Sequence, residues 1–237
     1  MASLASGFLL FNTGRLNFQA ARFLGVTPEL LQKTLSEGSV FLDVGANIGI
    51  FSLFASRLVG RSGKVLSIEA SPSIYEYLKY NLELNRSKNC IPKNIAAFER
   101  DGDTVEFYEP DSNKFGMGSL SGCFVQHSPV KTLSIDSWIA GVGIKRITLM
   151  KVDVEGWEAA VFLGAEKLLS REDAPLIVFE FADWAESNSE RYKVGRAQEI
   201  LKSHGYRLWR LSDFLKKRKP LPAILKRGAN MIVALKA

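Results

Sequence analysis

The sequence predicts an α/β protein built on an open, mostly parallel β-sheet with helices on both faces. Residues 40–54 run from a short apolar strand through a Gly-rich turn into apolar residues at helical spacing. Residues 147–156 contain a second apolar strand, followed at once by two acids and a glycine. Between and after these stretches, short apolar runs alternate with helical patterns, as expected for successive strand–helix–strand units.

Length and composition fit one domain with small additions. The chain has 237 residues, of which 46% are hydrophobic and 24% charged, which is ordinary for a soluble protein. We expect a main domain over residues 37–237 and an N-terminal helical segment over residues 1–36. Residues 1–26 carry apolar side chains at helical spacing. We expect one or two helices packed on the domain. The alternatives are a lid over its binding site or a membrane-surface helix, and the small number of basic residues argues against the membrane.

The basic residues are unevenly distributed. Seven of the 31 Lys and Arg residues lie in residues 215–237, which contain none of the 25 acids. We expect a basic loop over residues 215–228. Such a run is either a solvated loop or a contact surface for an anionic partner.

The cysteines indicate neither a metal site nor a disulfide. Cys90 and Cys123 lie far apart and lack the spacing of metal ligands. With no recognisable secretion signal and no apolar run of membrane-spanning length, we expect reduced thiols in a cytoplasmic protein.

The turn after the first strand narrows the choice of cofactor. It has Gly45, Asn47 and Gly49, whereas a dinucleotide fingerprint needs glycine at 45, 47 and 50. No phosphate-binding P-loop is present either. We expect the glycines to let the backbone approach a bulky cofactor closely. Asp43 at the strand end favours a cationic ligand without phosphates, which describes S-adenosylmethionine.

Acids follow four of the predicted strands. Glu69 ends the strand over residues 64–69, a position that typically accepts hydrogen bonds from ribose hydroxyls. Asp43, Asp153 and Glu180 stand at equivalent places. Because ligands bind at the carboxyl ends of parallel strands, the four acids predict a site there. The alternative is a purely structural strand–helix–strand unit in which Asp43 caps a helix.

The remaining elements follow from the same patterns. A first helix begins at Pro28, and another, after the glycine turn, near Ile48. Further helices are expected after Ser71, at Asp136 as a cap, from residue 157 to about 169, and over 194–203. Residues 110–129 are Gly- and Ser-rich and long for a simple loop, so we expect them to cover the site. The expected strands are 90–97, 104–108, 130–135, 147–152, 176–180, 206–210 and 231–235.

Two motifs resemble the signatures of the FkbM family of methyltransferases. They are Asp43-Val-Gly-Ala-Asn-Ile-Gly49 and Lys151-Val-Asp-Val-Glu-Gly156, and the resemblance covers residues 36–182. It implies a class I methyltransferase sheet of seven strands, the last antiparallel, with S-adenosylmethionine as methyl donor. It also implies a hydroxyl acceptor on a sugar, glycan or natural product. Trp157 departs from the smaller residue common in the family and leaves the size of the acceptor open.

On this interpretation the cofactor lies along the ends of the strands. The residues predicted to bind it are Asp43, Gly45, Ala46, Asn47, Gly49, Glu69, Ala70, Asn94, Ala96 and Asp153.

Removal of the acceptor's hydroxyl proton needs a base. Asp153 and Glu155 are two residues apart, so in an extended segment both would face the cofactor side of the sheet. We predict that Asp153 orients the cofactor or acceptor and that Glu155 takes the proton. Alternatively, Glu155 caps the following helix, and the base is Asp153, Glu180 or His127.

Two other classes of function remain open at this stage. A nucleic-acid methyltransferase or binder would use the basic segment, but no aromatic residue follows Phe214 to stack on bases. A non-catalytic domain would bind the cofactor as a structural element.

The sequence predicts no metal ligand. Carboxylates cluster, but their spacing does not match a known metal-binding motif. His204, before Gly205, is expected to end a helix, and the oligomeric state is open.

Overall fold

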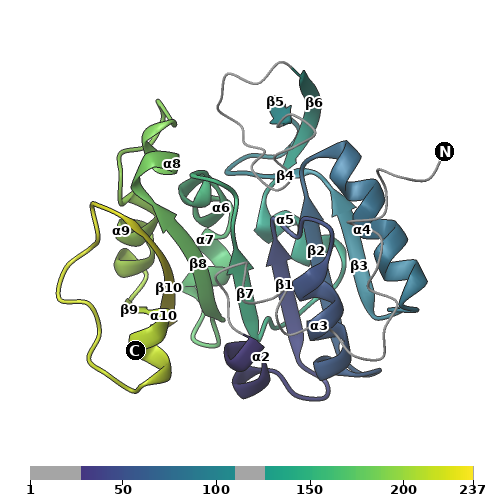
Figure 1. The fold of residues 1–237 in the computed structure, drawn as a ribbon, viewed down its shortest axis with the longest axis horizontal. Helices are drawn as coiled ribbons and strands as arrows, with labels where there is room; N and C mark the ends of the chain where they lie inside the picture. The colour runs from purple at the N-terminus through teal and green to yellow at the C-terminus, as the bar shows by residue number, and fades with distance from the viewer. Residues whose placement is uncertain (1–27, 110–125, 237) are drawn as a thin grey trace, which may run out of the picture.

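The computed structural model describes residues 28–109 and 126–236. The predicted helical patterns within residues 1–26, most of residues 110–129 and Cys123 lie outside this part. The described chain forms a central sheet with helices on both faces and a small second sheet beyond one end of its strands (Figure 1). In the described residues, no helix is long and apolar enough to cross a membrane.

The central sheet has seven strands in the order β3-β2-β1-β7-β8-β10-β9. β10 is antiparallel to both of its neighbours, and the other pairs are parallel. The predicted parallel sheet with a final antiparallel strand is therefore confirmed. Its strands are β1 (Val40–Val44), β2 (Lys64–Glu69), β3 (Cys90–Asn94), β7 (Leu149–Val152), β8 (Leu176–Ala182), β9 (Tyr206–Arg210) and β10 (Ala229–Lys236).

The strands of a parallel sheet carry apolar side chains on both faces, so helices cover both faces of the sheet. α5, α6, α7 and α9 contribute to the larger hydrophobic cluster on one face. α2, α3 and α10 contribute to the cluster on the other, and α4 packs beside α3. The helices are α2 (Pro28–Thr34), α3 (Ile50–Val59), α4 (Pro72–Leu84), α5 (Ile135–Gly141), α6 (Glu158–Leu163), α7 (Glu166–Ser170), α8 (Asp183–Ser187), α9 (Arg196–Ser203) and α10 (Leu211–Leu215).

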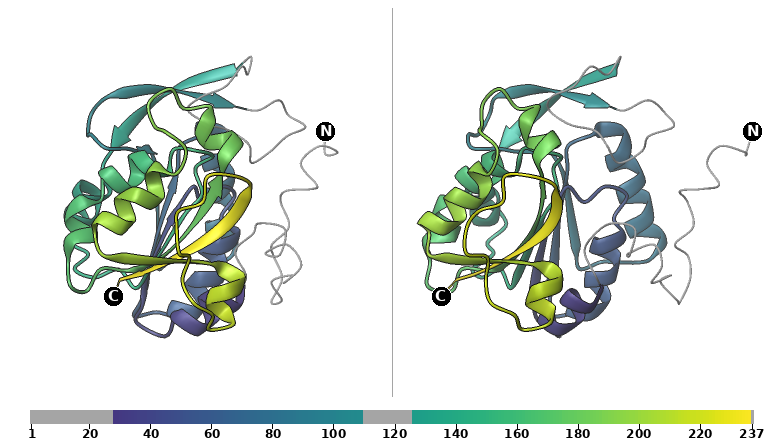
Figure 2. Two further views of the ribbon diagram at one scale, coloured as in Figure 1. Left: turned by 90° about the vertical axis from the view of Figure 1, so that its left-hand side faces the viewer. Right: turned by 60° about the vertical axis from the view of Figure 1, so that its left-hand side comes forward.

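A three-stranded sheet stands beyond the carboxyl ends of the parallel strands (Figure 2). It consists of β4 (Ala96–Ala97), β5 (Thr104–Glu109) and β6 (Gln126–Leu133) in the order β4-β6-β5. The strand expected over 90–97 is thus divided between the two sheets. Residues 126–129, expected in an irregular loop, belong to β6, whose pairing with β5 overrides their poor strand propensity.

Two helix predictions were wrong in detail. The single helix expected over residues 157–169 is broken into α6 and α7 at Gly164, where a Cβ would lie 2.0 Å from the carbonyl oxygen of Phe98. Asp136 does not cap its own helix, because the Ser134 side chain does so. The Asp136 carboxylate instead accepts hydrogen bonds from the backbone N–H groups at the start of α7.

The basic loop connects α10 to β10 through residues 216–228, which form neither helix nor strand. Its cationic side chains are largely exposed. Arg218 pairs with Asp213 at 3.1 Å, and Lys226 pairs with Glu199 at 3.4 Å. The loop is therefore partly tied to the body of the protein.

Candidate active site

The register of the sheet places three polar residues side by side. Asp43 on β1 lies opposite Ser67 on β2 and opposite Lys151 on β7. Ser52 of α3 covers them, donating to the Asp43 carboxylate at 2.6 Å and lying 2.8 Å from the Ser67 hydroxyl. All four side chains are buried, so the sheet contains a bonded polar row below its carboxyl edge.

Lys151 links this row to the glycine turn. Its Nζ donates to the carbonyl oxygen of Gly45 at 2.8 Å and lies 3.5 Å from a carboxylate oxygen of Asp43 and one of Asp153. Burial opposes the charge of Lys151, but the nearby carboxylates outweigh this effect and raise its pKa above the usual value. Lys151 is therefore a buried ammonium that connects the second predicted binding motif to the first. Sequence reasoning did not single it out, although it begins the second motif.

The glycines of the turn are required by neighbouring protein atoms. Gly45 has φ 75°, and a Cβ there would lie 1.9 Å from the carbonyl oxygen of Asp153. Gly49 has φ 91°, and its Cβ would lie 2.6 Å from Leu78 of α4. These glycines therefore let the end of β7 and α4 approach the turn. The close approach of a cofactor to the same backbone stays a prediction.

Glu69 holds the turn from the end of β2. One carboxylate oxygen accepts from the N–H of Asn47 at 2.8 Å, and the other accepts from the N–H of Ser71 at 2.9 Å. Burial raises the pKa of Glu69 to about 7 despite these bonds. Asn47 itself has φ 51°, in the left-handed region that Asn tolerates. Each oxygen of Glu69 keeps a further lone pair, so bonds to ribose hydroxyls remain compatible with this geometry.

The other predicted cofactor residues surround Glu69. The Asn94 side chain donates to the carbonyl oxygens of Glu69 and Ala70 at 2.8 and 2.9 Å, joining the ends of β2 and β3. Ala96 is buried beside Phe107 in a small cluster against which Ala70 packs. The N–H of Ala46 donates to Ile68 at 2.8 Å. These contacts support the shape of the site, and direct cofactor contacts stay a prediction.

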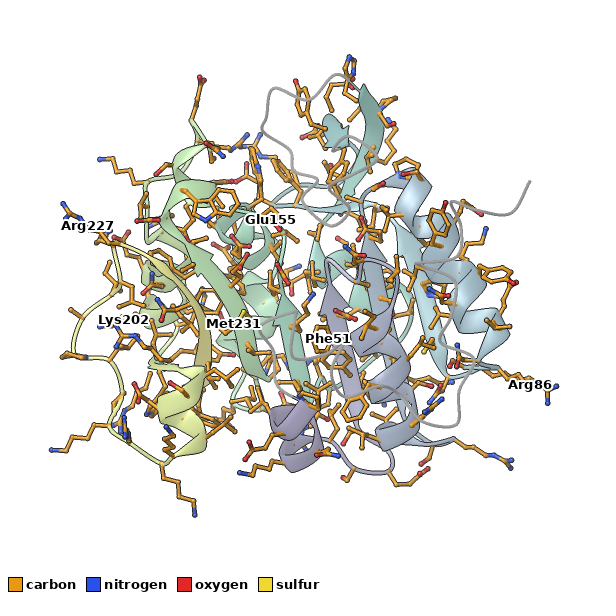
Figure 3. All side chains as sticks on the ribbon, viewed as in Figure 1. Phe51, Arg86, Glu155, Lys202, Arg227 and Met231 are labelled. Carbon is orange, nitrogen blue, oxygen red and sulfur yellow. The ribbon has the colours of Figure 1, made fainter. Side chains whose placement is uncertain are left out.

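Three carboxylates meet at the ends of β7 and β8. Each of Asp153, Glu155 and Glu180 offers an oxygen within 4.8 Å of the others, and Figure 3 shows Glu155 near this end of the sheet. The expected extended segment was wrong, because Glu155 has φ 52° and lies in a turn. The turn nevertheless brings its carboxylate to Asp153. This spacing also suits a cation, but an acid cluster alone does not establish a metal site.

Burial and mutual repulsion make two of these acids unusually basic. Burial, followed by the charges of Asp153 and Glu180, raises the pKa of Glu155 to about 8. Burial and Asp153 raise the pKa of Glu180 to about 7. A carboxyl with a pKa near the working pH is suited to general acid–base catalysis. The described residues therefore contain a base candidate next to the glycine turn.

Glu158, which sequence reasoning missed, shapes the turn that carries Glu155. Its buried carboxylate accepts from the N–H groups of Val154 at 3.0 Å and Gly156 at 3.5 Å. Gly156 has φ 96°, and a Cβ there would lie 2.3 Å from the carbonyl oxygen of Ala185. An acid in the first turn of a helix was the available signal.

The two histidines lie outside the acid cluster. His127 on β6 contacts the Glu106 carboxylate of β5 at 2.7 Å, and its side chain is exposed. His204 ends α9, as expected, with its Nδ1 3.3 Å from the Ser170 hydroxyl. The structure thus brings together Asp153, Glu155 and Glu180 but does not add His127 to them.

The motifs and the sheet agree with a known family. The model of the methyltransferase FkbM domain matches residues 43–208, from the acid of the first motif to β9. The chain belongs to the FkbM methyltransferase family. The resemblance seen in the two sequence motifs is thereby confirmed.

Two curated proteins show partial similarity to this FkbM-family chain. Methyltransferase sdnD from Sordaria araneosa is 26% identical over 163 residues, covering 56% of this chain and 62% of that protein. Protein-L-isoaspartate O-methyltransferase from Caenorhabditis elegans is 32% identical over 74 residues, covering 31% of this chain and 33% of that protein. The chain therefore spans less than two thirds of either relative.

Solved structures share the fold at low sequence identity. Fibrillarin from Aeropyrum pernix, solved with natively bound S-adenosyl-L-methionine, has a TM-score of 0.51 at 16% identity, covering 93% of this chain and 75% of that one. An O-methyltransferase from Bacillus cereus, in complex with SAH, has a TM-score of 0.50 at 14% identity, covering 98% and 85%. The FkbM-family chain thus has the fold of class I methyltransferases.

Proposed function

We propose that this protein uses S-adenosylmethionine to methylate a hydroxyl oxygen of a sugar, a glycan or another natural product. One observation carries the proposal. The glycine turn after β1 touches the backbone of Asp153, and Asp153 belongs to the acid cluster that contains Glu155. A cofactor cradle and a base candidate therefore adjoin, as methyl transfer to a hydroxyl requires. Membership of the FkbM family supports the same reaction class.

The charges around the turn suit a cationic ligand without phosphates. Among the described residues, the ion pairs give Asp43 and Asp153 a shared ammonium partner, Lys151. Glu69 and Glu155 add further carboxylates nearby. A diphosphate would meet repulsion from these acids, whereas the sulfonium and ammonium of S-adenosylmethionine would be attracted.

The chain's own groups divide the task of binding. We assign the ribose hydroxyls to Glu69 and the methionine end of the cofactor to the turn from Gly45 to Gly49. Lys151 and Asn94 act behind them, by holding Gly45 and the ends of β2 and β3.

Bound S-adenosylmethionine supplies a methyl group on a sulfonium, which an oxygen nucleophile displaces in line. The protein has to align the acceptor, exclude water and remove the hydroxyl proton. We assign proton removal to Glu155, because its pKa of about 8 makes it a stronger base than an ordinary glutamate. Asp153 and Glu180 maintain that basicity through their charges.

Calorimetry with S-adenosylmethionine tests the cofactor assignment. Glu69→Ala should weaken binding by about 1–3 kcal/mol, because it removes an acceptor from both the ribose and the turn. Glu83→Ala, on the exposed side of α4, is the matched control and should bind like the wild type. Wild-type affinity in Glu69→Ala would remove the ribose assignment.

A labelled methyl donor tests the reaction. The protein is incubated with the donor and with glycans, hydroxylated natural products, lipids and RNA, and the products are analysed by mass spectrometry. Label on a hydroxyl oxygen of a glycan or natural product is expected. Label on RNA alone would replace this acceptor class with the nucleic-acid alternative. Cofactor binding without label on any acceptor would favour a non-catalytic domain.

A further inference from the structure

Three aromatic rings meet beside the turn that carries Glu155. Trp157, two residues beyond Glu155, has its ring centroid 5.8 Å from that of Phe98 and 6.0 Å from that of Tyr192. Phe98 follows β4, and Tyr192 lies between α8 and α9. Three segments far apart in sequence therefore converge at the carboxyl edge of the sheet.

A charged pair borders the rings. The guanidinium of Arg191 lies 5.5 Å from the ring centroid of Phe98 and 5.9 Å from that of Tyr192. Glu99 accepts a hydrogen bond from the Tyr192 hydroxyl at 2.9 Å and also pairs with Arg191. The side chain of Arg191 is 47% exposed and that of Glu99 is 15% exposed. Donors and acceptors are thus held in place at the protein surface.

The exposure of the rings is graded. Phe98 is buried, with only 5% of its surface exposed, whereas Trp157 and Tyr192 are only partly buried. Buried aromatic rings contribute packing energy, but a ring left partly exposed beside a base candidate also offers a surface for a ligand. The C–H face of a saturated ring packs on an aromatic side chain, while its hydroxyls bond to charged groups at the rim.

We propose that Trp157 and Tyr192, with the Arg191–Glu99 pair, form the acceptor subsite and select a hydroxyl carried on a saturated polyhydroxylated ring over one on an open chain. This inference rests on the proposed function, since it supplies the acceptor to Glu155. It gives Trp157 the role of a specificity-determining residue. Arg191 and Glu99 fix the rotation of the ring by bonding its hydroxyls.

Binding without the methyl donor gives the first test. The probes are methyl glucoside and sorbitol, which carry similar hydroxyls on a ring and on an open chain. In a Trp184→Phe background, which removes an exposed tryptophan of α8, methyl glucoside should quench the tryptophan fluorescence at millimolar concentrations. Sorbitol should not, and the additional change Trp157→Phe should abolish the quench. Equal responses to the two probes, or a quench that survives Trp157→Phe, would overturn the subsite.

Steady-state kinetics gives the second test, with the ring acceptor that the label assay identifies. Trp157→Ala should raise KM by about 10-fold or more, the loss of one well-packed aromatic contact, with kcat much less changed. Tyr192→Phe, which loses only the bond to Glu99, should have a smaller effect. Trp184→Ala is the control. Thermal melting and affinity for S-adenosylmethionine report whether each variant is folded.

The outcomes separate the two proposals. If no acceptor is methylated but methyl glucoside still quenches Trp157, the proposed reaction fails and the subsite stands. If an acceptor is methylated and Trp157→Ala and Trp184→Ala have the same KM, the reaction stands and the subsite is wrong. If Trp157→Ala does not fold, the KM values of Trp157→Phe and Tyr192→Phe are compared with that of Trp184→Ala instead. Values equal to the control would overturn the subsite.

Discussion

The polar row around Lys151 and the acid cluster around Glu155 are neighbours, joined by the contact between Lys151 and Asp153 of the cluster, yet they are built differently. In the row, the Ser52 hydroxyl and the Lys151 ammonium balance the buried Asp43 carboxylate. In the cluster, carboxylates face one another and are only partly buried. The row balances charge and holds the turn in shape. In the cluster, burial and then the like charges of the neighbouring acids raise the pKa of Glu155 and Glu180.

This difference indicates where stability and chemistry lie. A buried ion pair that loses one member leaves an uncompensated charge in a medium of low polarity. A cluster of like charges behaves in the opposite way, since neutralising one member relieves repulsion. We therefore expect substitutions in the row to destabilise the fold, and substitutions in the cluster to reduce turnover while the fold is kept.

Lys151→Met should have the largest effect on stability. It leaves Asp43 without its ammonium and the Gly45 carbonyl without its donor, which should lower the free energy of unfolding by about 3–5 kcal/mol. Lys64→Met, at an exposed position of β2, is the matched control. Urea denaturation measures both. The double variant Asp43→Asn/Lys151→Met should recover part of the loss, and a single variant as stable as the control would contradict the charge balance.

Glu155→Gln should have the largest effect on catalysis. The change keeps the shape but removes the base, so turnover should fall by roughly 10²–10⁴ while S-adenosylmethionine affinity changes little. Glu172→Gln, at an exposed position, is the control. Retained turnover with a folded, cofactor-binding variant would mean that Glu155 is structural, and the base would then be Asp153, Glu180 or His127.

The same variant should be more stable than the wild type at high pH. Because the pKa of Glu155 is raised from 4.5 to about 8, the folded state favours the protonated form. The stability that this form contributes is lost as pH rises from 4.5 to about 8. Gln is always neutral, so thermal melting should show an advantage of about 1–3 kcal/mol above that pH. No advantage at pH 9 would contradict the raised pKa.

Glu180→Gln sharpens the comparison within the cluster. Removing this like charge should lower the pKa of Glu155, since Glu180 is one of the groups that raise it. The rise of kcat/KM with pH should therefore move to lower pH. An unchanged profile would show that Glu155 is not the titrating base, whatever the loss in overall rate.

Gly45→Ala tests the point where the two regions touch. The added Cβ would lie 1.9 Å from the Asp153 carbonyl oxygen. Gly102 also has positive φ, but no atom of the described residues lies within 4 Å of its Cβ position. Gly102→Ala should cost about 1–2 kcal/mol from backbone strain alone, and Gly45→Ala about 1–3 kcal/mol more. If urea denaturation gives the two variants the same loss in the free energy of unfolding, the segment after β7 can shift to accommodate the added Cβ at little cost.

Neutralising the basic loop should have the smallest effect. Replacing Lys216, Lys217, Arg218 and Lys219 with Gln removes exposed charges remote from both regions, so the S-adenosylmethionine affinity should change by less than about 0.5 kcal/mol. If the loop docks an anionic acceptor, wild-type turnover will fall as salt rises and the variant will lose that dependence. An identical salt profile would support a solvated loop.

The sequence by itself determined the parts of this protein that depend on local patterns. Apolar periodicity located the strands and most helices, and the turn residues between Asp43 and Gly49 identified the first binding unit. The acids Glu69, Asp153 and Glu180 were found because each lies at or near the carboxyl end of an apolar strand, and parallel strands bring these ends to one edge. These inferences need only neighbours in the chain and the general rules of parallel sheets.

Only the tertiary structure decided which of these groups act on one another. The register of β1 against β7 places Lys151 beside Asp43, 108 residues away in sequence, and no local pattern specifies that register. The close approach of the residue after β7 explains why position 45 is glycine. The turn at Glu155 brings the acids together where an extended chain was expected. Trp157 meets Phe98 and Tyr192 for the same reason. Contacts between distant segments follow from the packing of whole elements, which single residues do not encode.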